Sequence, residues 1–212
     1  MNGIMKECLV EWELNGIPQS PVLCSGQDVD ALLLGRMITS GMVNPNCRTE
    51  AIELNENHWR VSADTVVNAD AGILNKMEKL VPNPSDRKAE RPELSALCDE
   101  LMTQEHSTGL HSVLLSDGRQ CVVGRDIGRH NALDIAVGKA LKTKMNLPRT
   151  IFCTTARITL ETLVRAARAG IPILATRKPV GSLCVEHAEK LNIAVCRVGA
   201  ETKCFSAVWR VI

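Results

Sequence analysis

Residues 150–198 alternate between short apolar runs and amphipathic stretches. TIFCTT, IPILAT and IAVCRV are strand-like, and apolar residues recur with helical spacing between them, from Thr159 to Ala169 and from Ser182 to Leu191. Two successive strand–helix–strand units indicate neighbouring parallel strands joined by right-handed crossovers. The sequence therefore predicts an α/β fold in which helices pack on a mixed sheet.

The first part of the chain predicts a smaller α+β lobe. Residues 8–14 alternate as a strand does, and residues 49–62 alternate around a polar turn as a hairpin does. A helix is predicted between these two segments, with Ser25 able to act as its N-cap and Gly41 able to end it. The lobe is predicted to comprise residues 1–80.

Residues 81–92, VPNPSDRKAERP, are rich in proline and charge and form the predicted linker. Residues 93–212 form the predicted α/β cofactor-binding domain, which begins with a helix after Pro92. Within this domain, residues 111–124 predict a hairpin and residues 131–142 predict an amphipathic helix.

Composition argues against several classes of partner. The formal net charge is +1, so no overall field favours DNA or a membrane surface. Two Phe, three Trp and no Tyr leave few rings on which single-stranded bases could stack. No apolar run reaches the roughly 18 residues of a membrane span, and the N-terminus shows no signal-peptide pattern. We therefore expect a cytoplasmic protein that binds neither nucleic acid nor membrane.

Nine cysteines are dispersed along the chain, and no two are closer than eight residues. A four-coordinate zinc site needs clustered Cys or His ligands, so the sequence predicts no zinc and no other metal site. An odd number of cysteines without paired spacing also argues against a disulfide framework. Most of these thiols lie in apolar runs, where buried, reduced side chains are expected.

Three loops share one design: each leaves a predicted strand, carries an arginine and enters a predicted helix. They span residues 124–131, 154–159 and 176–182. Strand ends of an open α/β sheet meet along one edge, where such folds bind ligands. Helix N-termini attract anions, and a guanidinium group can grip a phosphate with two hydrogen bonds. The loops therefore predict a shared phosphate or pyrophosphate site, although neither a Walker A nor a GxGxxG motif is present.

Single residues of these loops also have structural interpretations. One arginine in such a loop can be a solvated or salt-bridged surface residue. Asp126 and Asp134 can pair with Arg129 and shape the first loop. His130 is either a ligand-contacting donor or a histidine satisfied at the start of its helix. For His111 a structural role is slightly favoured.

The loop and helix GRDIGRHNALDIAVGKAL resemble the signature of the formate dehydrogenase accessory sulfurtransferase family, FdhD/NarQ. In that family Asp-Val-Gly-Arg-His-Asn-Ala-Leu-Asp opens a helix, and here Ile127 replaces the valine. Residues 155–195 resemble the next family block, and residues 108–111 resemble a Thr-Gly-Gly-x-His motif. The resemblance is strong from residue 108 to about residue 195 and weak before residue 80.

The resemblance implies a fold related to cytidine deaminase: a three-layer sandwich with helices on both faces of a mixed sheet, usually as a homodimer. It also implies a protein that takes sulfur from a cysteine desulfurase and passes it to the molybdenum cofactor, bis-molybdopterin guanine dinucleotide, which then enters formate dehydrogenase. The guanine nucleotide part of that cargo suits the predicted anion site. The implied cofactor-binding residues are Thr108, Gly109, His111, Asp126, Gly128, Arg129, His130, Asn131, Thr155, Arg157, Arg177 and Ser182.

The chain departs from the family at the sulfur carrier. Members of the family have a cysteine in a Cys-Gly-x-Cys-Gly motif, but residues 62–72 of this chain read SADTVVNADAG, and no cysteine lies between positions 47 and 98. A persulfide needs a reactive, accessible thiolate. The sequence therefore leaves the catalytic residue unknown.

Four functions remain open at this point. The chain can be an accessory protein that keeps the anion site without the usual persulfide. It can be a sulfurtransferase that uses another cysteine, with Cys121 and Cys47 as candidates. It can be a non-catalytic nucleotide-binding protein. The fourth function, a nucleotide deaminase or hydrolase, is disfavoured because the His-x-Glu and Pro-Cys-x-x-Cys zinc signature is missing.

Overall fold

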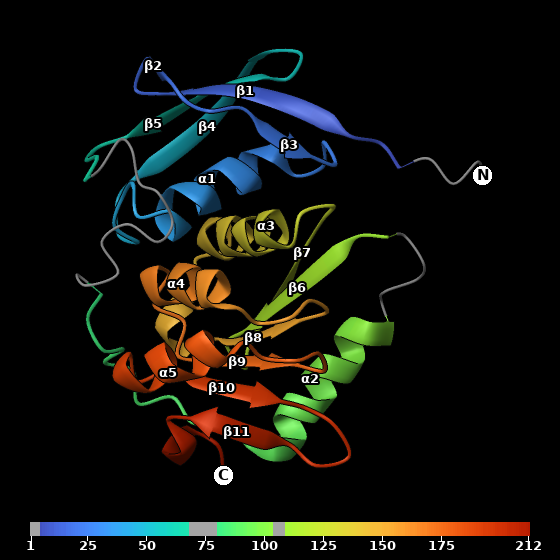
Figure 1. Cartoon of the computed structure of the whole chain (residues 1–212). Coiled ribbons are helices and arrows are strands. Elements are labelled where there is room, and N and C mark those ends of the chain that lie inside the picture. The colour runs from blue at the N-terminus through green and yellow to red at the C-terminus, as the bar shows by residue number, and fades with distance from the viewer. Residues whose placement is uncertain (1–4, 68–79, 104–108) are drawn as a thin grey trace.

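The computed structural model describes residues 5–67, 80–103 and 109–212 (Figure 1). Its larger sheet has six strands in the order β11-β10-β9-β8-β6-β7. β8, β9 and β10 are parallel neighbours, whereas β6 runs antiparallel to both β7 and β8, and β11 runs antiparallel to β10. The strands are β6 (His111–Ser116), β7 (Cys121–Asp126), β8 (Ile151–Thr154), β9 (Ile173–Thr176), β10 (Ala194–Arg197) and β11 (Lys203–Ser206).

Helices cover both faces of this sheet, as predicted. Phe152 and Leu174 point from β8 and β9 into the core shared with α3 (Arg129–Lys142), α4 (Leu160–Arg168) and α5 (Ser182–Lys190). Cys153 and Ala175 point the other way, into a core shared with Leu94 of α2 (Arg91–Thr103). The alternation follows from the pleat, which turns successive side chains to opposite faces. Short 3-10 helices lie at Leu147–Arg149 and Val208–Arg210.

The N-terminal lobe holds a second sheet with the order β2-β1-β5-β4, and β3 also pairs with β1. The predicted hairpin over residues 49–62 is confirmed as β4 and β5, and β5 runs parallel to β1. One helix, α1, lies under this sheet (Figure 1). The elements are β1 (Cys8–Leu14), β2 (Ile17–Pro18), β3 (Val22–Cys24), α1 (Val29–Thr39), β4 (Thr49–Asn55) and β5 (His58–Ala63).

The prediction that Ser25 caps the first helix is wrong. The helix begins at Val29, and its N-cap is Asp28 in the left-handed conformation (φ 50°). Ser25 is buried, and its backbone N–H donates to Asp126 at 2.8 Å. Between Ser25 and the helix, Gly26 and Asp28 both adopt positive φ, a conformation that glycine and aspartate tolerate better than most residues.

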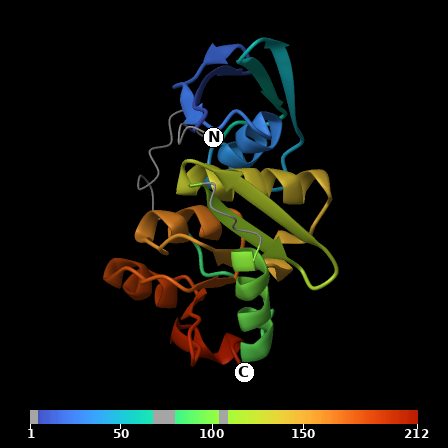
Figure 2. The same ribbon diagram turned by 90° about the vertical axis from the view of Figure 1, so that its right-hand side faces the viewer.

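α1 and α3 cross in close contact through two glycines. A Cβ atom on Gly35 would lie 1.8 Å from the Asp134 carbonyl oxygen, and one on Gly138 would lie 1.9 Å from the Ala31 carbonyl oxygen. No side chain fits into that space, so only glycine allows the two backbones to approach this closely. Figures 1 and 2 both show α1 lying directly on α3.

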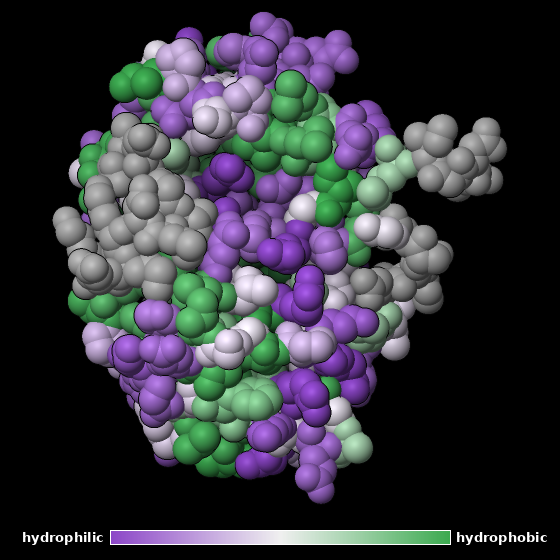
Figure 3. Space-filling model, in the orientation of Figure 1, coloured by the Kyte–Doolittle hydropathy of each residue, from purple (hydrophilic) through white to green (hydrophobic). Residues whose placement is uncertain are grey.

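As a result, one hydrophobic core runs through both parts of the molecule. It extends from Trp12 of β1 through Met37 of α1 and Val137 of α3 to Phe152 of β8. On the face shown in Figure 3, hydrophilic side chains gather at the level of α3 and α4, between the two sheets. None of the helices in the described ranges is long and apolar enough to cross a bilayer.

The proline-rich segment lies against the larger unit. Asn83 is buried, and its backbone N–H donates to the Leu191 carbonyl at 2.8 Å. Ala89, also buried, exchanges backbone hydrogen bonds with the end of the chain, at Arg210 and Ile212. Residues 83–91 are therefore fixed by hydrogen bonds that a free linker would lack. The division of the chain into two domains at residues 81–92 stays a prediction.

Candidate functional site

The three arginine-bearing loops meet at one end of the strands of the larger sheet, which we call the loop edge. Because β6 runs antiparallel to both β7 and β8, the strands β7, β8 and β9 all end at the edge where β6 begins. His111, the first residue of β6, pairs in register with Asp126, and Thr154 pairs with Thr176. This edge lies on the right in Figure 1 and faces the viewer in Figure 2. The predicted convergence of the loops is therefore present.

Backbone pairing continues beyond the strands and joins the second and third loops. Ile158 and Val180 form an isolated parallel bridge, and the Gly181 N–H donates to the Ile158 carbonyl at 2.9 Å. The buried Thr155 is held to β6, since its Oγ1 accepts from the Ser112 N–H at 3.0 Å and its own N–H donates to the Ser112 carbonyl at 3.1 Å. Thr155 thus positions the second loop from within.

Asp126 organises the first loop. It is fully buried, and its carboxylate accepts from the Gly128 N–H at 2.9 Å and from the Asn131 side-chain amide at 2.8 Å. The other oxygen accepts from the Ser25 N–H at 2.8 Å, and Asn131 also donates to the Leu23 carbonyl at 2.8 Å. These two side chains tie the N-cap of α3, Gly128, to the N-terminal lobe.

The expectation that Asp126 or Asp134 pairs with Arg129 is wrong. Asp134 is fully buried on α3, and its carboxylate accepts from Arg165 at 2.9 Å and from the Thr39 hydroxyl at 2.6 Å. Arg36 lies 3.6 Å from the same carboxylate. The carboxylate therefore joins α1, α3 and α4 through buried, charge-assisted contacts, while Arg129 stays on the loop edge.

Arg129 and His130 open α3 and reach toward α4. The Arg129 Nε–H donates to His130 Nε2 at 3.3 Å, and His130 Nδ1 lies 3.0 Å from Glu161 of α4. Burial, together with the positive charges of Arg165 and Arg129, lowers the pKa of His130 from 6.5 to about 4, although Asp134 opposes this shift. His130 is therefore neutral near pH 7, and the edge there takes its positive charge from Arg129.

The other two arginines differ. Arg157 is exposed in the second loop, and its guanidinium makes no hydrogen bond or ion pair with any residue that the structure describes. Arg177 is instead paired with Asp99 of α2, on the other side of the sheet. Arg129 and Arg157 are thus available to an anion, whereas Arg177 already has a carboxylate partner.

Two further predicted residues, Ser182 and Gly109, lie at the same edge. Ser182 is exposed as the first residue of α5, and Gly109 precedes β6 with φ at +68°. Thr108 lies outside the described residues. The edge therefore offers two unneutralised guanidinium groups, a neutral histidine and the N-termini of three helices, an arrangement that favours binding an extended anion.

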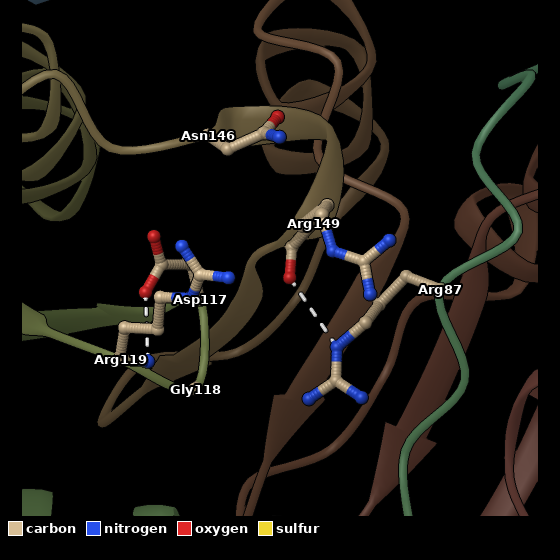
Figure 4. Close-up of a pocket in the computed structure, with 6 residues that line it drawn as sticks. All are labelled: Arg87, Asp117, Gly118, Arg119, Asn146 and Arg149. Atoms are coloured by element: carbon tan, nitrogen blue, oxygen red, sulfur yellow. Dashed lines mark hydrogen bonds between the residues drawn. The ribbon is translucent and has the colours of Figure 1, made fainter.

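A cavity lies at the opposite edge of the sheet, where no ligand was predicted. Its volume is about 430 Å³, and its lining includes three arginines. Figure 4 shows Arg119 at the β6–β7 turn, on the far side of the opening from Arg87 and Arg149. Two of these charges are partly balanced, because Arg87 pairs with Glu93 at 2.5 Å and Arg149 lies 3.6 Å from Asp86.

Sequence reasoning missed a pair of cysteines. The strand β11 was not predicted, because KCFS is short and carries little alternation. It brings Cys204 directly opposite Cys196 of β10. The signal was present in outline: the two cysteines are separated by a polar, glycine-containing segment, as in a hairpin. Within the described ranges, no three Cys, His, Asp or Glu side chains are grouped so that they could hold a metal ion.

Comparison with known proteins identifies a family. Residues 5–211 match the sequence profile of the FdhD/NarQ family. A sulfur carrier protein FdhD from Wolinella succinogenes is 21% identical over 217 aligned positions, covering 91% of this chain and 76% of that protein. A sulfur carrier protein FdhD from Picrophilus torridus is 25% identical and covers 83% of this chain and 77% of its own length.

A solved structure has the same fold. It is a crystal structure described as a formate dehydrogenase accessory protein from Desulfotalea psychrophila. The two chains superpose with a TM-score of 0.86 at 22% sequence identity, over 98% of this chain and 90% of the other. At that identity the likeness establishes the fold.

Proposed function

Because the chain belongs to the FdhD/NarQ family, we propose that it is an accessory protein in the maturation of formate dehydrogenase. Its cargo would be the molybdenum cofactor in its guanine dinucleotide form, held by the nucleotide part at the loop edge. Sulfur delivered by a cysteine desulfurase would belong to the same task. The names of the sulfur carrier relatives support this role.

The observation that carries the proposal is the state of Arg129 and Arg157. Both lie on loops that enter helices at one sheet edge, and neither is neutralised by a carboxylate among the described residues. Guanidinium groups hold phosphate in two-point contacts, and helix N-termini add favourable dipoles. We expect such an edge to bind the negatively charged pyrophosphate of a guanine nucleotide more tightly than an uncharged nucleoside.

His130, Asp126 and Thr155 would act by positioning. Asp126 and Thr155 fix the first and second loops through backbone hydrogen bonds. His130, neutral at pH 7, sets the orientation of Arg129 through the Nε contact at 3.3 Å. A homodimeric state and a cytoplasmic location are further parts of the proposal, carried by the family resemblance and the composition.

The test is calorimetric titration of the purified chain with guanosine diphosphate and with guanosine. We expect the diphosphate to bind and guanosine to bind far more weakly. Arg129→Ala and Arg157→Ala should each weaken diphosphate binding by about 1.5–3 kcal/mol, the range for hydrogen bonds to charged groups. Lysine at either position should restore binding only in part, because the planar fork is lost.

Arg119→Ala is the matched control, since Arg119 lines the cavity at the opposite edge. It should leave the affinity unchanged. Equal affinity for guanosine and its diphosphate would remove the phosphate site. A loss of binding in Arg119→Ala with none in Arg129→Ala or Arg157→Ala would move the site to the cavity.

A further inference from the structure

Two cysteines face each other in the hairpin formed by β10 and β11, the last two strands on the side of the sheet opposite β7. Cys196 of β10 and Cys204 of β11 are direct partners in antiparallel register. Opposed residues in such strands have Cα atoms about 4.5–5.5 Å apart, within the range that places two sulfur atoms in contact. Cys196 is fully buried, whereas Cys204 is partly exposed on the edge strand. Cys204 is therefore the accessible thiol of the pair, and Cys196 is the buried thiol opposite it.

The thiol pair has a polarised environment. The Cys196 thiol donates a hydrogen bond to Cys204 Sγ, and the positive charge of Arg91 acts on both sulfur atoms. Arg91, the first residue of α2, is held over this hairpin because its guanidinium donates to the Thr202 carbonyl at 2.5 Å. A neighbouring thiol donor and a fixed cation both favour a thiolate at Cys204.

The pKa values follow this arrangement. The hydrogen bond from Cys196 and the charge of Arg91 lower the pKa of Cys204 from 9.0 to about 7, although burial opposes the shift. The pKa of Cys196 is raised, because it keeps the proton that it donates to Cys204 and is buried. Burial raises the pKa of Cys24 to about 11 and that of Cys184 to about 12.

The other accessible cysteines lack a comparable partner. Cys121 is exposed at the start of β7, near the far edge of the sheet. Cys47 donates to backbone carbonyls, with Sγ 3.4 Å from the Thr65 oxygen, and Cys8 donates to Asn57 Oδ1 at 2.8 Å. Cys204 Sγ also lies 3.2 Å from the Ser206 carbonyl oxygen, but among the accessible thiols that the structure describes it is the one that faces a second cysteine and a fixed guanidinium.

We propose that Cys204 is the sulfur-accepting nucleophile of this chain, with Cys196 as the positioning thiol that donates a hydrogen bond to it. The proposal rests on the proposed function for its biological donor, a protein persulfide. It replaces Cys121 and Cys47, the candidates from sequence, and it uses no residue of the 62–72 segment.

The chemical step is a thiolate displacement. Cys204 S⁻ attacks the outer sulfur of a donor persulfide, R–S–SH; the new S–S bond forms as the donor S–S bond breaks, and the donor thiolate R–S⁻ leaves. The product is Cys204–S–SH, and no outside oxidant or reductant is consumed. The Cys196 S–H stays protonated throughout, donating its hydrogen bond to the Cys204 sulfur.

The experiment treats the full chain with cysteine persulfide, blocks free thiols with an alkylating agent and locates adducts by peptide mass spectrometry. We expect an added mass of about 32 Da, one sulfur atom, on the peptide that contains Cys204. Cys204→Ser should lose it. Cys121→Ser and Cys47→Ser are matched controls and should keep the wild-type yield. An adduct on Cys121 or Cys47 that persists in Cys204→Ser would overturn the proposal.

A second measurement tests the role of Cys196 and needs no persulfide. The alkylation rate of Cys204 is followed against pH in the wild type, Cys196→Val and Cys196→Ser. We expect a wild-type midpoint near pH 7. In Cys196→Val it should rise toward about 8.5 and slow alkylation at pH 7 roughly tenfold. Cys196→Ser keeps a hydroxyl donor and should restore most of the low midpoint. Identical profiles for all three proteins would remove the positioning role.

Nucleotide titration of the same variants separates this inference from the proposed function. Cys204→Ser should bind guanosine diphosphate as the wild type does, because β11 lies apart from the Arg129 loop in strand order. Intact nucleotide binding with no adduct on Cys204 would reject the sulfur site alone. An adduct on Cys204 with no nucleotide binding would reject the loop-edge site alone.

Discussion

His130 places a titratable group between three guanidiniums and two carboxylates. Burial opposes its protonation most, followed by the charges of Arg165, Arg129 and Arg36, while Asp134 favours protonation and Glu161 lies 3.0 Å from Nδ1. The depressed pKa shows that the opposing group prevails. The structure gives His130 a structural role, because it is held by Glu161 and in turn contacts Arg129, while its role in contacting a ligand stays a prediction.

This arrangement predicts a pH-dependent loss of stability. The folded pKa of about 4 lies below the ordinary value of 6.5, so the unfolded chain takes up a proton more readily. The stability linked to the neutral form of His130 is fully present above pH 6.5 and is lost as the pH falls toward 4. Urea unfolding at pH 7 and pH 4.5 should show that the wild type loses roughly 2–3 kcal/mol more than His130→Gln.

The comparison with His130→Gln cancels the carboxylates that titrate in the same window in both proteins. If the Glu161 contact prevailed instead, the wild type would lose less stability than His130→Gln as the pH falls. Equal losses in the two proteins would show that His130 titrates in the folded state as it does in the unfolded chain.

At the scale of elements, the contact between α1 and α3 depends on two glycines, Gly35 and Gly138. Gly35→Ala and Gly138→Ala should each destabilise the protein by about 3 kcal/mol or more, because a Cβ would overlap a backbone carbonyl that cannot move away alone. Helix propensity works in the opposite direction, since alanine is favoured over glycine by about 1 kcal/mol in a helix interior. Thermal and urea unfolding of both variants measure the net effect.

Gly199→Ala serves as the control, because a Cβ at this position would lie 3.6 Å from the Glu201 carbonyl oxygen, an ordinary van der Waals distance. That variant should unfold within about 0.5 kcal/mol of the wild type, as surface substitutions usually do. Neutral or stabilising effects of Gly35→Ala and Gly138→Ala would mean that the two helices can separate without loss.

Elements with long periodic patterns were predictable from the sequence. The strand–helix–strand units over residues 150–198 and the two hairpins follow from spacing alone. β2 and β3 were missed because two or three residues are too few to show a period, and β11 was missed because KCFS lacks the apolar run that marks β8, β9 and β10. The start of α1 was misplaced because its N-cap is Asp28 in the left-handed conformation, while Ser25 is held instead by a long-range contact with Asp126.

The candidate site was predictable in its position and less so in its roles. Strand order brings the loops together, and that follows from topology. The sequence does not show which charged side chains are paired, because their partners lie far away along the chain. Asp134 meets Arg165 and Arg177 meets Asp99, and nothing local in the sequence indicates either pair. The Cys196–Cys204 pair likewise required the register of a strand that was not predicted.

At the scale of the whole molecule, the shared core predicts one cooperative unit. Among the described residues, the buried apolar side chains of β1 and α1 belong to the same core as those of α3. We expect scanning calorimetry to show a single transition whose calorimetric and van't Hoff enthalpies agree. Two separable transitions, or a stable folded fragment comprising residues 93–212, would favour two independent domains joined at residues 81–92.

The contact between α1 and α3 also has a consequence for biosynthesis. Gly35 and Gly138 meet in the folded protein, but roughly 100 residues separate them along the chain, which takes on the order of 5–20 s to synthesise. Until α3 leaves the ribosome, the first helix has only its own sheet to cover it, and the side that later meets α3 stays open to water. The N-terminal sheet and α1 are thus synthesised first, but their packing is completed only when α3 is available. During that interval the nascent chain needs protection from aggregation.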